Sequence, residues 1–311
     1  MPAQTLVQGA EAAGQWEQTI YAFLAEKERR SGSMRTVDNY SRMLYRFFGV
    51  TGKPPDKVVS ADVFGYAHGI GLSGKKPSSA TVGARIACIS SFYRFLVRMG
   101  LVIANPCDQL ERPRATPAAP RGLTAVDIKR LLAAIPETPV GLRDRAIILT
   151  LTLTGRRRSE VLNLRVGDLS REGEVVHYTY RGKGGKRGKR ELPQPALWAI
   201  QRSLEAFEKN LANMKPTESL WPSSTMNDRG ITGGTFYGNL RRHFKRAGLP
   251  PAGVHILRHS AAKLRRGAGE SIEDVSRFLD HSNLAVTTVY LSKLEGERDE
   301  RWRRVAEELG V

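Results

Sequence analysis

The sequence contains very little cysteine. Only Cys88 and Cys107 occur among 311 residues, and neither belongs to a CxxC pair or to a Cys/His cluster. This excludes a disulfide scaffold and a structural zinc site, because both need more ligands at fixed spacings. We expect both thiols to be reduced, and we expect Cys88, which falls in an apolar helical pattern, to lie in a core.

Long hydrophobic runs are also missing. No stretch approaches the ~20 apolar residues that a membrane-spanning helix needs. The longest, near residues 146–153, is interrupted by threonines and is typical of a buried helix. The N-terminus lacks a basic segment followed by an apolar one, so no secretory signal is expected. These absences predict a cytoplasmic protein.

Several catalytic motifs are absent. The sequence has no GxxxxGK[ST] loop, no HExxH helix and no Asp/Glu cluster suited to magnesium catalysis. We therefore expect no nucleotide, metal or other cofactor.

Negative charge is scarce relative to positive charge. Lys and Arg number 49 against 31 Asp and Glu, a formal net charge of +18. Residues 1–110 carry 13 basic and 8 acidic side chains, so most of the excess lies beyond them but both parts are basic. Such a balance indicates a polyanionic partner, with nucleic acid as the first candidate, rather than a basic tail.

Amphipathic helices are predicted along the N-terminal part, because apolar residues recur at helical spacing. Lys75 and Lys76 precede the last of these helices, which Ser78 or Ser79 can cap; such an N-terminus suits phosphate, although a plain cap explains it equally. The apolar stripes are Trp16, Ile20, Phe23 and Leu24; Tyr40, Met43, Leu44 and Phe47; and Ile86, Ile89, Tyr93 and Leu96.

Residues 112–122 contain three prolines, which disfavour a helix and predict a linker. Beyond it, Thr124 with Asp127 predicts the start of a helix, and another helix is expected over 142–153. Residues 174–191 read as a strand, a basic glycine-rich turn and a returning strand, and helical patterns resume near Pro195. The fold class is therefore mainly α with a small β-sheet.

Four segments carry groups suited to phosphate chemistry, and each has a simpler structural explanation. Residues 154–160 place three arginines between two helices, where they can bind phosphate or form a solvated turn. Lysines of the turn in 181–190 can donate a proton to a phosphate or only contact DNA backbone. His255 and Arg258 share a helical face. Tyr290 follows His281 by nine residues, in a position where tyrosine usually only packs.

The order of these segments resembles the pattern of the tyrosine recombinase (phage integrase) family. Its TGxRxSE, GKG, HxLRH and LGHxxxxxTxxY motifs correspond to residues 154–160, 182–184, 255–259 and 279–290. Residues 84–96, followed by Asn105-Pro106, are similar to the end of that family's helical core-binding domain. The resemblance spans residues 14–295, and because little precedes residue 14 it is closest to the Xer-like two-domain type.

The resemblance implies a site-specific recombinase that cleaves and rejoins DNA through a 3′-phosphotyrosine intermediate without ATP. It implies a core-binding domain over 14–111, a linker over 112–122 and a mixed α/β catalytic domain over 123–311, which together form a C-shaped clamp on DNA. Glu160 is expected to orient an arginine or His255. The implied catalytic residues are Arg157, Lys183, His255, Arg258, His281 and Tyr290.

The residue types suit this reaction. Two arginines can stabilise the charge that develops on a phosphate without a metal, and nearby cations favour the phenolate of a tyrosine whose ordinary pKa is ~10. Asp280 departs from the pattern, which has glycine there, so the turn before His281 is expected to be tighter or less basic. Lys186 is an alternative to Lys183 as the acid.

Further DNA contacts and self-assembly are also expected. A type IB topoisomerase-like activity and a non-catalytic DNA-binding protein are the alternatives to recombination. Four protomers are implied by strand exchange, and an amphipathic stripe on residues 302–309 is expected to dock on a neighbouring protomer or on its own domain. The expected DNA contacts are Arg156, Arg158, Lys75, Lys76, Arg85, Arg181, Lys186 and Arg187.

Overall fold

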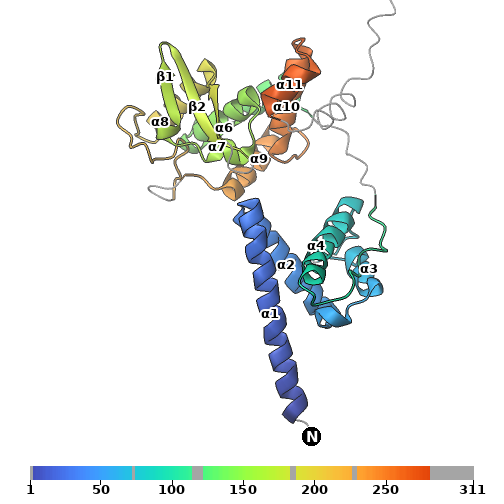
Figure 1. Cartoon of the computed structure of the whole chain (residues 1–311). Coiled ribbons are helices and arrows are strands. Elements are labelled where there is room, and N and C mark those ends of the chain that lie inside the picture. The colour runs from blue at the N-terminus through green and yellow to red at the C-terminus, as the bar shows by residue number, and fades with distance from the viewer. Residues whose placement is uncertain (1–2, 72–73, 114–121, 183–186, 226–229, 281–311) are drawn as a thin grey trace, which may run out of the picture. The chain divides into compact units, whose positions relative to one another are not determined.

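The chain divides into two compact units, Met1–Pro117 and Ala118–Val311. The computed structural model describes residues 3–71, 74–113, 122–182, 187–225 and 230–280, with side chains from Trp16 onward. Each unit has its own hydrophobic core. The described residues are mostly helical with one small sheet (Figure 1), which confirms the predicted fold class.

The N-terminal unit is a group of helices around an aromatic core. Phe23, Phe47 and Phe92 are fully buried, and Phe23 meets Phe92 edge to face with ring centroids 5.3 Å apart. The helix α3 was not predicted, and α1 begins before residue 14. The elements are α1 (Ala3–Ser31), α2 (Met34–Thr51), a 3-10 turn (Pro55–Lys57), α3 (Ser60–His68) and α4 (Ser79–Arg98).

The helix α4 is the central element of this unit. Ser78 caps it by accepting a hydrogen bond from the Thr81 backbone N–H at 3.3 Å, as the sequence predicts for a serine at this place. Among the described helices, α4 alone is long and apolar enough to cross a membrane, but half of its apolar window is buried within the unit. Cys88 on α4 and Cys107 are both free and Cys88 is buried, as predicted, and Cys107 is buried as well.

Arg85 of α4, expected from the sequence to contact DNA, is partly exposed and also has a structural role. Its Nη1 donates to the backbone carbonyls of Tyr66, Ala67 and Gly69 at 2.9, 3.0 and 2.8 Å. These carbonyls end α3 and have no partner within that helix. The guanidinium also lies 5.3 Å from the centroid of the Tyr66 ring. Arg85 therefore fixes α3 to α4.

The C-terminal unit surrounds the buried helix α6. Thr124 and Asp127 form the predicted capping box at the start of α5, with mutual hydrogen bonds of 3.0 and 3.1 Å. Residues 207–225 and 230–232 do not continue the expected helical pattern. The helices are α5 (Ala125–Ala133), α6 (Pro139–Thr154), α7 (Arg158–Leu162), α8 (Gln194–Ala206), α9 (Gly233–Arg246), α10 (His255–Gly267) and α11 (Ile272–Leu279).

An antiparallel sheet lies beside these helices, with strand order β1-β2-β3 (Figure 1). The strands are β1 (Leu169–Glu172), β2 (Val175–Arg181) and β3 (Arg187–Glu191), with β1 preceded by a 3-10 turn at Val166–Asp168. Strands β2 and β3 form the predicted hairpin. Alternate residues of β2 face the core, including Tyr178 and Tyr180.

A buried polar cluster joins α6 to α9. Asp144 of α6 is fully buried and accepts hydrogen bonds from Asn239 at 2.9 Å and from Arg143 at 3.0 Å. The His243 Nε2 also lies 3.0 Å from the Asp144 carboxylate. Arg143 donates to the Pro222 carbonyl at 2.8 Å. These contacts offset the cost of burying the Asp144 carboxylate and the Arg143 guanidinium, whereas the Nδ1 of His243 is buried without a hydrogen-bond partner among the described residues.

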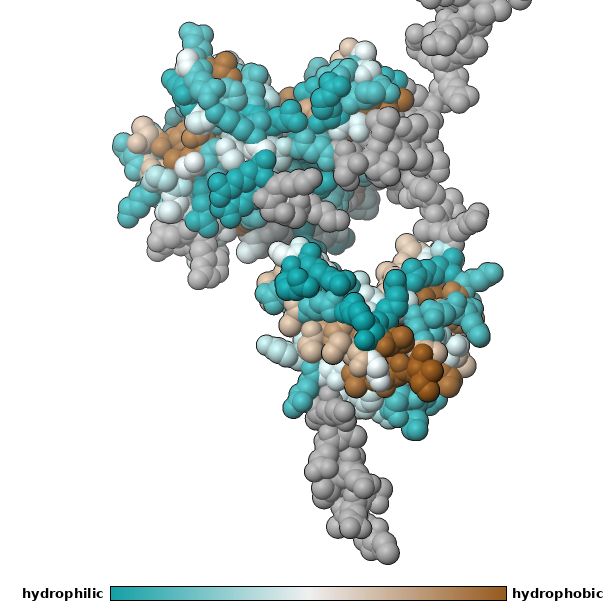
Figure 2. Space-filling model, viewed as in Figure 1, coloured by the Kyte–Doolittle hydropathy of each residue, from teal (hydrophilic) through white to brown (hydrophobic). Residues whose placement is uncertain are grey.

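Hydrophilic residues dominate the visible surface of both units, and each unit also shows apolar areas (Figure 2). On the N-terminal unit, exposed apolar side chains include Phe64 and Ile70 at 53% and 64% of their free area. Scattered residues of this kind are ordinary on a protein surface.

Candidate active site

The three arginines of residues 156–158 lie where α6 gives way to α7. Gly155 ends α6 in the left-handed region, with φ 62°. A Cβ on Gly155 would lie 2.4 Å from the Phe278 ring and 2.9 Å from Leu279. Only glycine therefore allows α11 to pack this closely, and the segment 155–157, here called the arginine loop, is held against the end of α11.

Arg157 is held by a buried carboxylate. Glu160 is 4% exposed, and its Oε1 accepts from the Arg157 Nη1 at 2.8 Å while its Oε2 accepts from the Arg157 backbone N–H at 2.9 Å. The Arg157 side chain remains 35% exposed. Glu160 thus orients an arginine that an outside anion can still reach.

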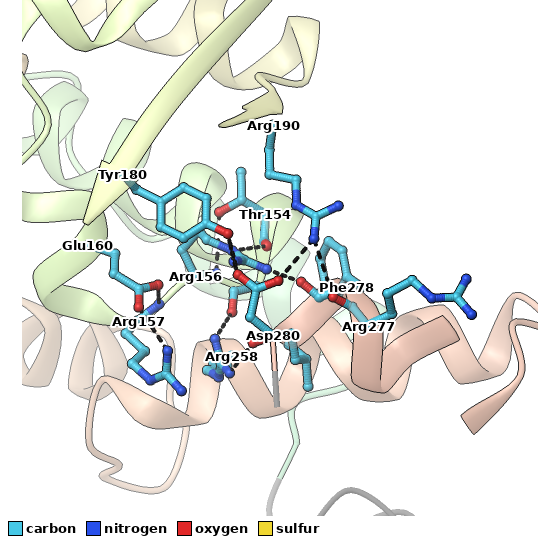
Figure 3. A network of polar contacts seen from close by, with 12 residues as sticks. Thr154, Arg156, Arg157, Glu160, Tyr180, Arg190, Arg258, Arg277, Phe278 and Asp280 are labelled. Carbon is cyan, nitrogen blue, oxygen red and sulfur yellow. Dashed lines mark hydrogen bonds and ion pairs between the residues drawn. The ribbon is translucent and has the colours of Figure 1, made fainter. Parts of the chain in front are cut away.

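Arg258, on α10, lies beside the same loop. It is 7% exposed, and its Nη1 and Nη2 donate to the carbonyls of Gly155 and Leu279, both at 2.6 Å. Burial, followed by repulsion from Arg157 and Arg156, lowers the pKa of Arg258 to about 10. Arg258 is still charged at neutral pH, so Arg157 and Arg258 bring two positive charges to this place, and of the two only Arg157 has a carboxylate among the described residues as its hydrogen-bond partner (Figure 3).

His255 begins α10, three residues before Arg258, and its side chain is exposed. Partial burial of the ring lowers the pKa of His255, and the charges of Arg158 and Arg258 lower it further. The lowered pKa favours the neutral imidazole, which can accept a proton. The structure brings His255, Arg157 and Arg258 together, as the motif pattern predicted.

The Arg156 side chain points into the protein, although the sequence predicted a DNA contact for it. The structure buries it to 1% exposure, so it does not contact DNA. Its Nη1 donates to the Tyr180 hydroxyl at 2.7 Å and pairs with the Asp280 carboxylate, and its Nη2 donates to the Phe278 carbonyl. A buried guanidinium needs such partners. Figure 3 shows the side chains of Arg156 and Tyr180 directed toward Asp280. Arg158 donates to the Gly233 carbonyl at 3.3 Å and is partly exposed.

Asp280 ends α11 in the left-handed conformation, with φ 52° and ψ 47°. Glycine suits this region best, and aspartate is one of the few other residues that tolerate it. Burial raises the pKa of Asp280, but the hydrogen bond from Tyr180 and the charge of Arg156 outweigh that effect and leave the pKa below its usual value. The turn is thus one that glycine would also make, and the added charge is neutralised by arginines.

The other expected site residues lie on the N-terminal unit, on the β2–β3 hairpin, or outside the described residues. Lys75 and Lys76 are exposed on the N-terminal unit. Arg181 and Arg187 are exposed and face each other in register at the ends of β2 and β3. The residues Lys183, Lys186, His281 and Tyr290, together with the amphipathic stripe of 302–309, lie outside the described residues.

Sequence reasoning missed Tyr180 and Arg190. The Arg190 Nη2 donates to the Asp280 Oδ1 at 2.9 Å, and the Tyr180 hydroxyl donates to the Asp280 Oδ2. The only signal in the sequence was Asp280 itself, a carboxylate where the motif has glycine. Nothing local marks its partners, because they lie 90 to 124 residues away along the chain.

Comparisons with known proteins agree with this geometry. Residues 121–297 match the model of the phage integrase family. The tyrosine recombinase XerC of Alcanivorax borkumensis is 30% identical over 279 residues, 88% of either chain. The tyrosine recombinase XerD of Listeria innocua is 28% identical over 265 residues, which cover 83% of this chain and 88% of the relative.

Solved structures show the same fold. The crystal structure of a lambda integrase (75–356) dimer bound to a COC′ core site has a TM-score of 0.67 at 17% identity, with 90% of this chain and 98% of that one covered. XerH recombinase bound to palindromic difH substrate, in a post-cleavage complex, has a TM-score of 0.65 at 19% identity, with 96% and 84% covered. This chain therefore belongs to the phage integrase family of tyrosine recombinases, enzymes that cleave and rejoin DNA strands.

Proposed function

We propose that the chain is a site-specific DNA recombinase of the Xer-like type and that Tyr290 is its nucleophile. The observation that carries this proposal is the pair Arg157 and Arg258, held by Glu160 and by backbone carbonyls beside His255, whose lowered pKa favours the neutral imidazole. Two fixed cations and a proton acceptor are what a metal-independent attack on a phosphodiester requires.

In the proposed reaction the Tyr290 oxygen attacks the scissile phosphorus, and His255 accepts the phenol proton. Arg157 and Arg258 stabilise the charge that builds on the non-bridging oxygens, and His281 donates a hydrogen bond to the same phosphate. The bond from phosphorus to the 5′-oxygen breaks, and Lys183, or else Lys186, protonates that oxygen. A 5′-hydroxyl from a second strand reverses these steps, so the energy of the bond is retained and no ATP is consumed.

DNA contact and assembly follow from the same proposal. The exposed cations Lys75, Lys76, Arg181 and Arg187, with the partly exposed Arg158, are proposed to contact backbone phosphates. Strand exchange between two duplexes needs four cleavages, so we propose a tetramer of this chain on two DNA sites. The cytoplasm, where DNA is accessible in bacteria such as those of the matched relatives, is the proposed location.

Tyr290→Phe tests the nucleophile, because it removes only the attacking oxygen. The variant should bind a target duplex with unchanged affinity but form no adduct that survives denaturation, whereas the parent chain should form one. Tyr237→Phe, an exposed tyrosine on α9, is the matched control and should form the adduct. An adduct with Tyr290→Phe would refute the assignment. Relaxation of supercoiled DNA without recombinant product would favour a topoisomerase-like activity.

A further inference from the structure

One carboxylate joins three separate segments of the C-terminal unit. Asp280 ends α11, and its Oδ2 meets both Arg156 of the arginine loop and the Tyr180 hydroxyl of β2. Its Oδ1 accepts from Arg190 of β3 at 2.9 Å. Figure 3 shows the three side chains reaching Asp280 from the sheet and from the arginine loop.

Each joined segment is adjacent to a group of the proposed reaction. Arg156 precedes Arg157, and Asp280 precedes His281. Tyr180 and Arg190 stand on the two strands of the hairpin whose turn carries Lys183 and Lys186. The Asp280 carboxylate therefore binds both strands of the hairpin. Through Arg156 it also connects the hairpin to the arginine loop, which contains Arg157.

The hairpin is shaped to make this contact. Gly188 of β3 is paired with Tyr180 across the ladder, and a Cβ at Gly188 would lie 2.4 Å from the Tyr180 ring and hydroxyl. The missing side chain leaves room for the Tyr180 ring, which also lies 4.7 Å from the guanidinium of Arg156. Tyr180 is consequently 6% exposed and fixed in direction.

Charge compensation alone does not explain the arrangement. Arg156 is buried and needs the Asp280 carboxylate. Arg190 has no such need, because its side chain is 46% exposed and water can solvate it. An exposed ion pair of this kind adds little stability, so its consequence is geometric: it fixes the second strand of the hairpin to α11.

We propose that Asp280 is a positioning residue that, through Tyr180 and Arg190, docks strands β2 and β3 on the arginine loop and thereby supports proton donation by the hairpin lysine to the leaving 5′-oxygen. This rests on the proposed function, in which that lysine is the general acid. Misplacement of a catalytic group by about 1 Å costs up to about 100-fold in rate, so a loosened hairpin should slow cleavage without abolishing DNA binding.

The test uses the full chain and two duplexes, one with an ordinary scissile phosphate and one with a 5′-bridging sulfur. A thiol leaves with a pKa of ~8.5 and needs no acid, whereas an alkoxide does. Arg190→Gln and Tyr180→Phe should slow adduct formation about tenfold or more on the ordinary duplex at saturating DNA. On the sulfur duplex they should come within about threefold of the parent chain. Asp280→Asn, which keeps the shape, should behave alike.

Lys189→Gln is the matched control. It removes the same charge from the same strand, but Lys189 pairs with Glu172 of β1 and not with α11. Its rates should equal those of the parent chain on both duplexes. Arg190→Gln and Tyr180→Phe also protect the test if Asp280→Asn fails to fold, since neither leaves a buried charge.

Two failures can be told apart. If Lys183→Ala or Lys186→Ala recovers on the sulfur duplex but Arg190→Gln and Tyr180→Phe do not, the positioning role is overturned and the acid assignment stands. If neither lysine variant recovers, the hairpin supplies no acid, and the proposal is overturned together with that step of the mechanism. Unchanged rates for Arg190→Gln and Tyr180→Phe on the ordinary duplex would also overturn it.

Discussion

Three consecutive arginines differ completely in their surroundings. Arg156 is buried against Asp280, Arg157 is held by Glu160 but reachable, and Arg158 donates to the Gly233 carbonyl. Arg157 and Arg158, with Arg258, surround His255 with positive charge. At the scale of the residue, function is therefore decided by which carboxylate or carbonyl each cation meets.

The charge around His255 leads to a pH prediction. If neutral His255 accepts the tyrosine proton, adduct formation is lost as the pH falls through the pKa of His255. Because burial and the arginines lower that pKa, the acid limb of the rate profile should have its midpoint below ~6.5, the ordinary value for histidine. The profile is measured from single-turnover adduct formation between pH 5 and pH 8.

His255→Gln provides the comparison. It should react more slowly and lose the acid limb, because glutamine does not titrate. An acid limb that persists unchanged in His255→Gln would show that another group is the proton acceptor.

The sequence predicted the reactive arginines better than their neighbours. Arg157 and Arg258 follow from motif spacing, and both lie together in the structure. The burial of Arg156 did not follow, because it depends on Asp280, which is 124 residues away in the chain. The backbone contacts of Arg85 did not follow from the sequence either, since its acceptors belong to the end of α3. The role of a residue cannot be predicted from the neighbouring sequence when it depends on contacts with residues far away in the chain.

The helix α6 is buried along most of its length and carries two charged residues in the core. Arg143 and Asp144 lie in the core with exposures of 2% and 0%. These two residues connect α6 to α9 and to the Pro222 carbonyl. The C-terminal end of α6 is followed directly by the arginine loop, so the cluster also helps to fix the base of the proposed active site.

Asp144→Asn should therefore destabilise the C-terminal unit. The amide keeps the shape but leaves Arg143 as a buried charge without its counter-ion, and breaking a buried pair costs about 3–5 kcal/mol. Urea unfolding followed by circular dichroism measures the change. Glu137→Gln, which removes an exposed carboxylate paired with Arg145 and Arg202, is the control and should change stability little. Equal midpoints for the two variants would contradict the prediction.

Elements with a clear apolar period were predicted from the sequence, and others were not. The helices α1, α2 and α4, the capped start of α5 and the β2–β3 hairpin were all expected. Strand β1 was missed because its residues, Leu-Ser-Arg-Glu, are polar and mostly exposed, so no alternation marks it. Residues 207–232 were expected to be helical, but the described part of this segment is not. Its buried apolar residues include Leu220, Trp221 and Ile231, and the Trp221 Nε1 donates to the Val161 carbonyl at 2.6 Å. These buried residues do not recur at the spacing of a helix or of a strand.

At the scale of the whole molecule, the two units are each basic and each has its own core. The division at Pro117 falls within the proline-rich stretch that the sequence marks as a linker. Composition and linker chemistry are properties of the whole chain, so they could be predicted without knowledge of any long-range contact. The number of copies that assemble on DNA is a proposal that needs its own test.

Removal of residues 297–311 tests assembly. If the amphipathic stripe of Trp302, Val305, Ala306 and Leu309 docks on a neighbouring protomer, the shortened chain should bind a single DNA site but should not form the four-protomer complex. Sedimentation velocity with duplex DNA distinguishes these species. Trp302→Ala in the full chain should weaken assembly in the same direction. Unchanged assembly of the shortened chain would show that the stripe packs on its own domain.

The pair of Arg156 and Asp280 also constrains the order in which such a site can change over evolution. Asp280 is 32% exposed and keeps Arg190 as a partner, so a chain that has Asp280 without Arg156 carries no stranded buried charge. A chain with Arg156 and glycine at position 280 would bury a cation with no carboxylate partner among the described residues. During evolution, aspartate at position 280 can therefore appear before arginine at position 156. Once Arg156 is present, Asp280 cannot revert to glycine unless Arg156 is replaced first, because the buried guanidinium would lose its carboxylate partner.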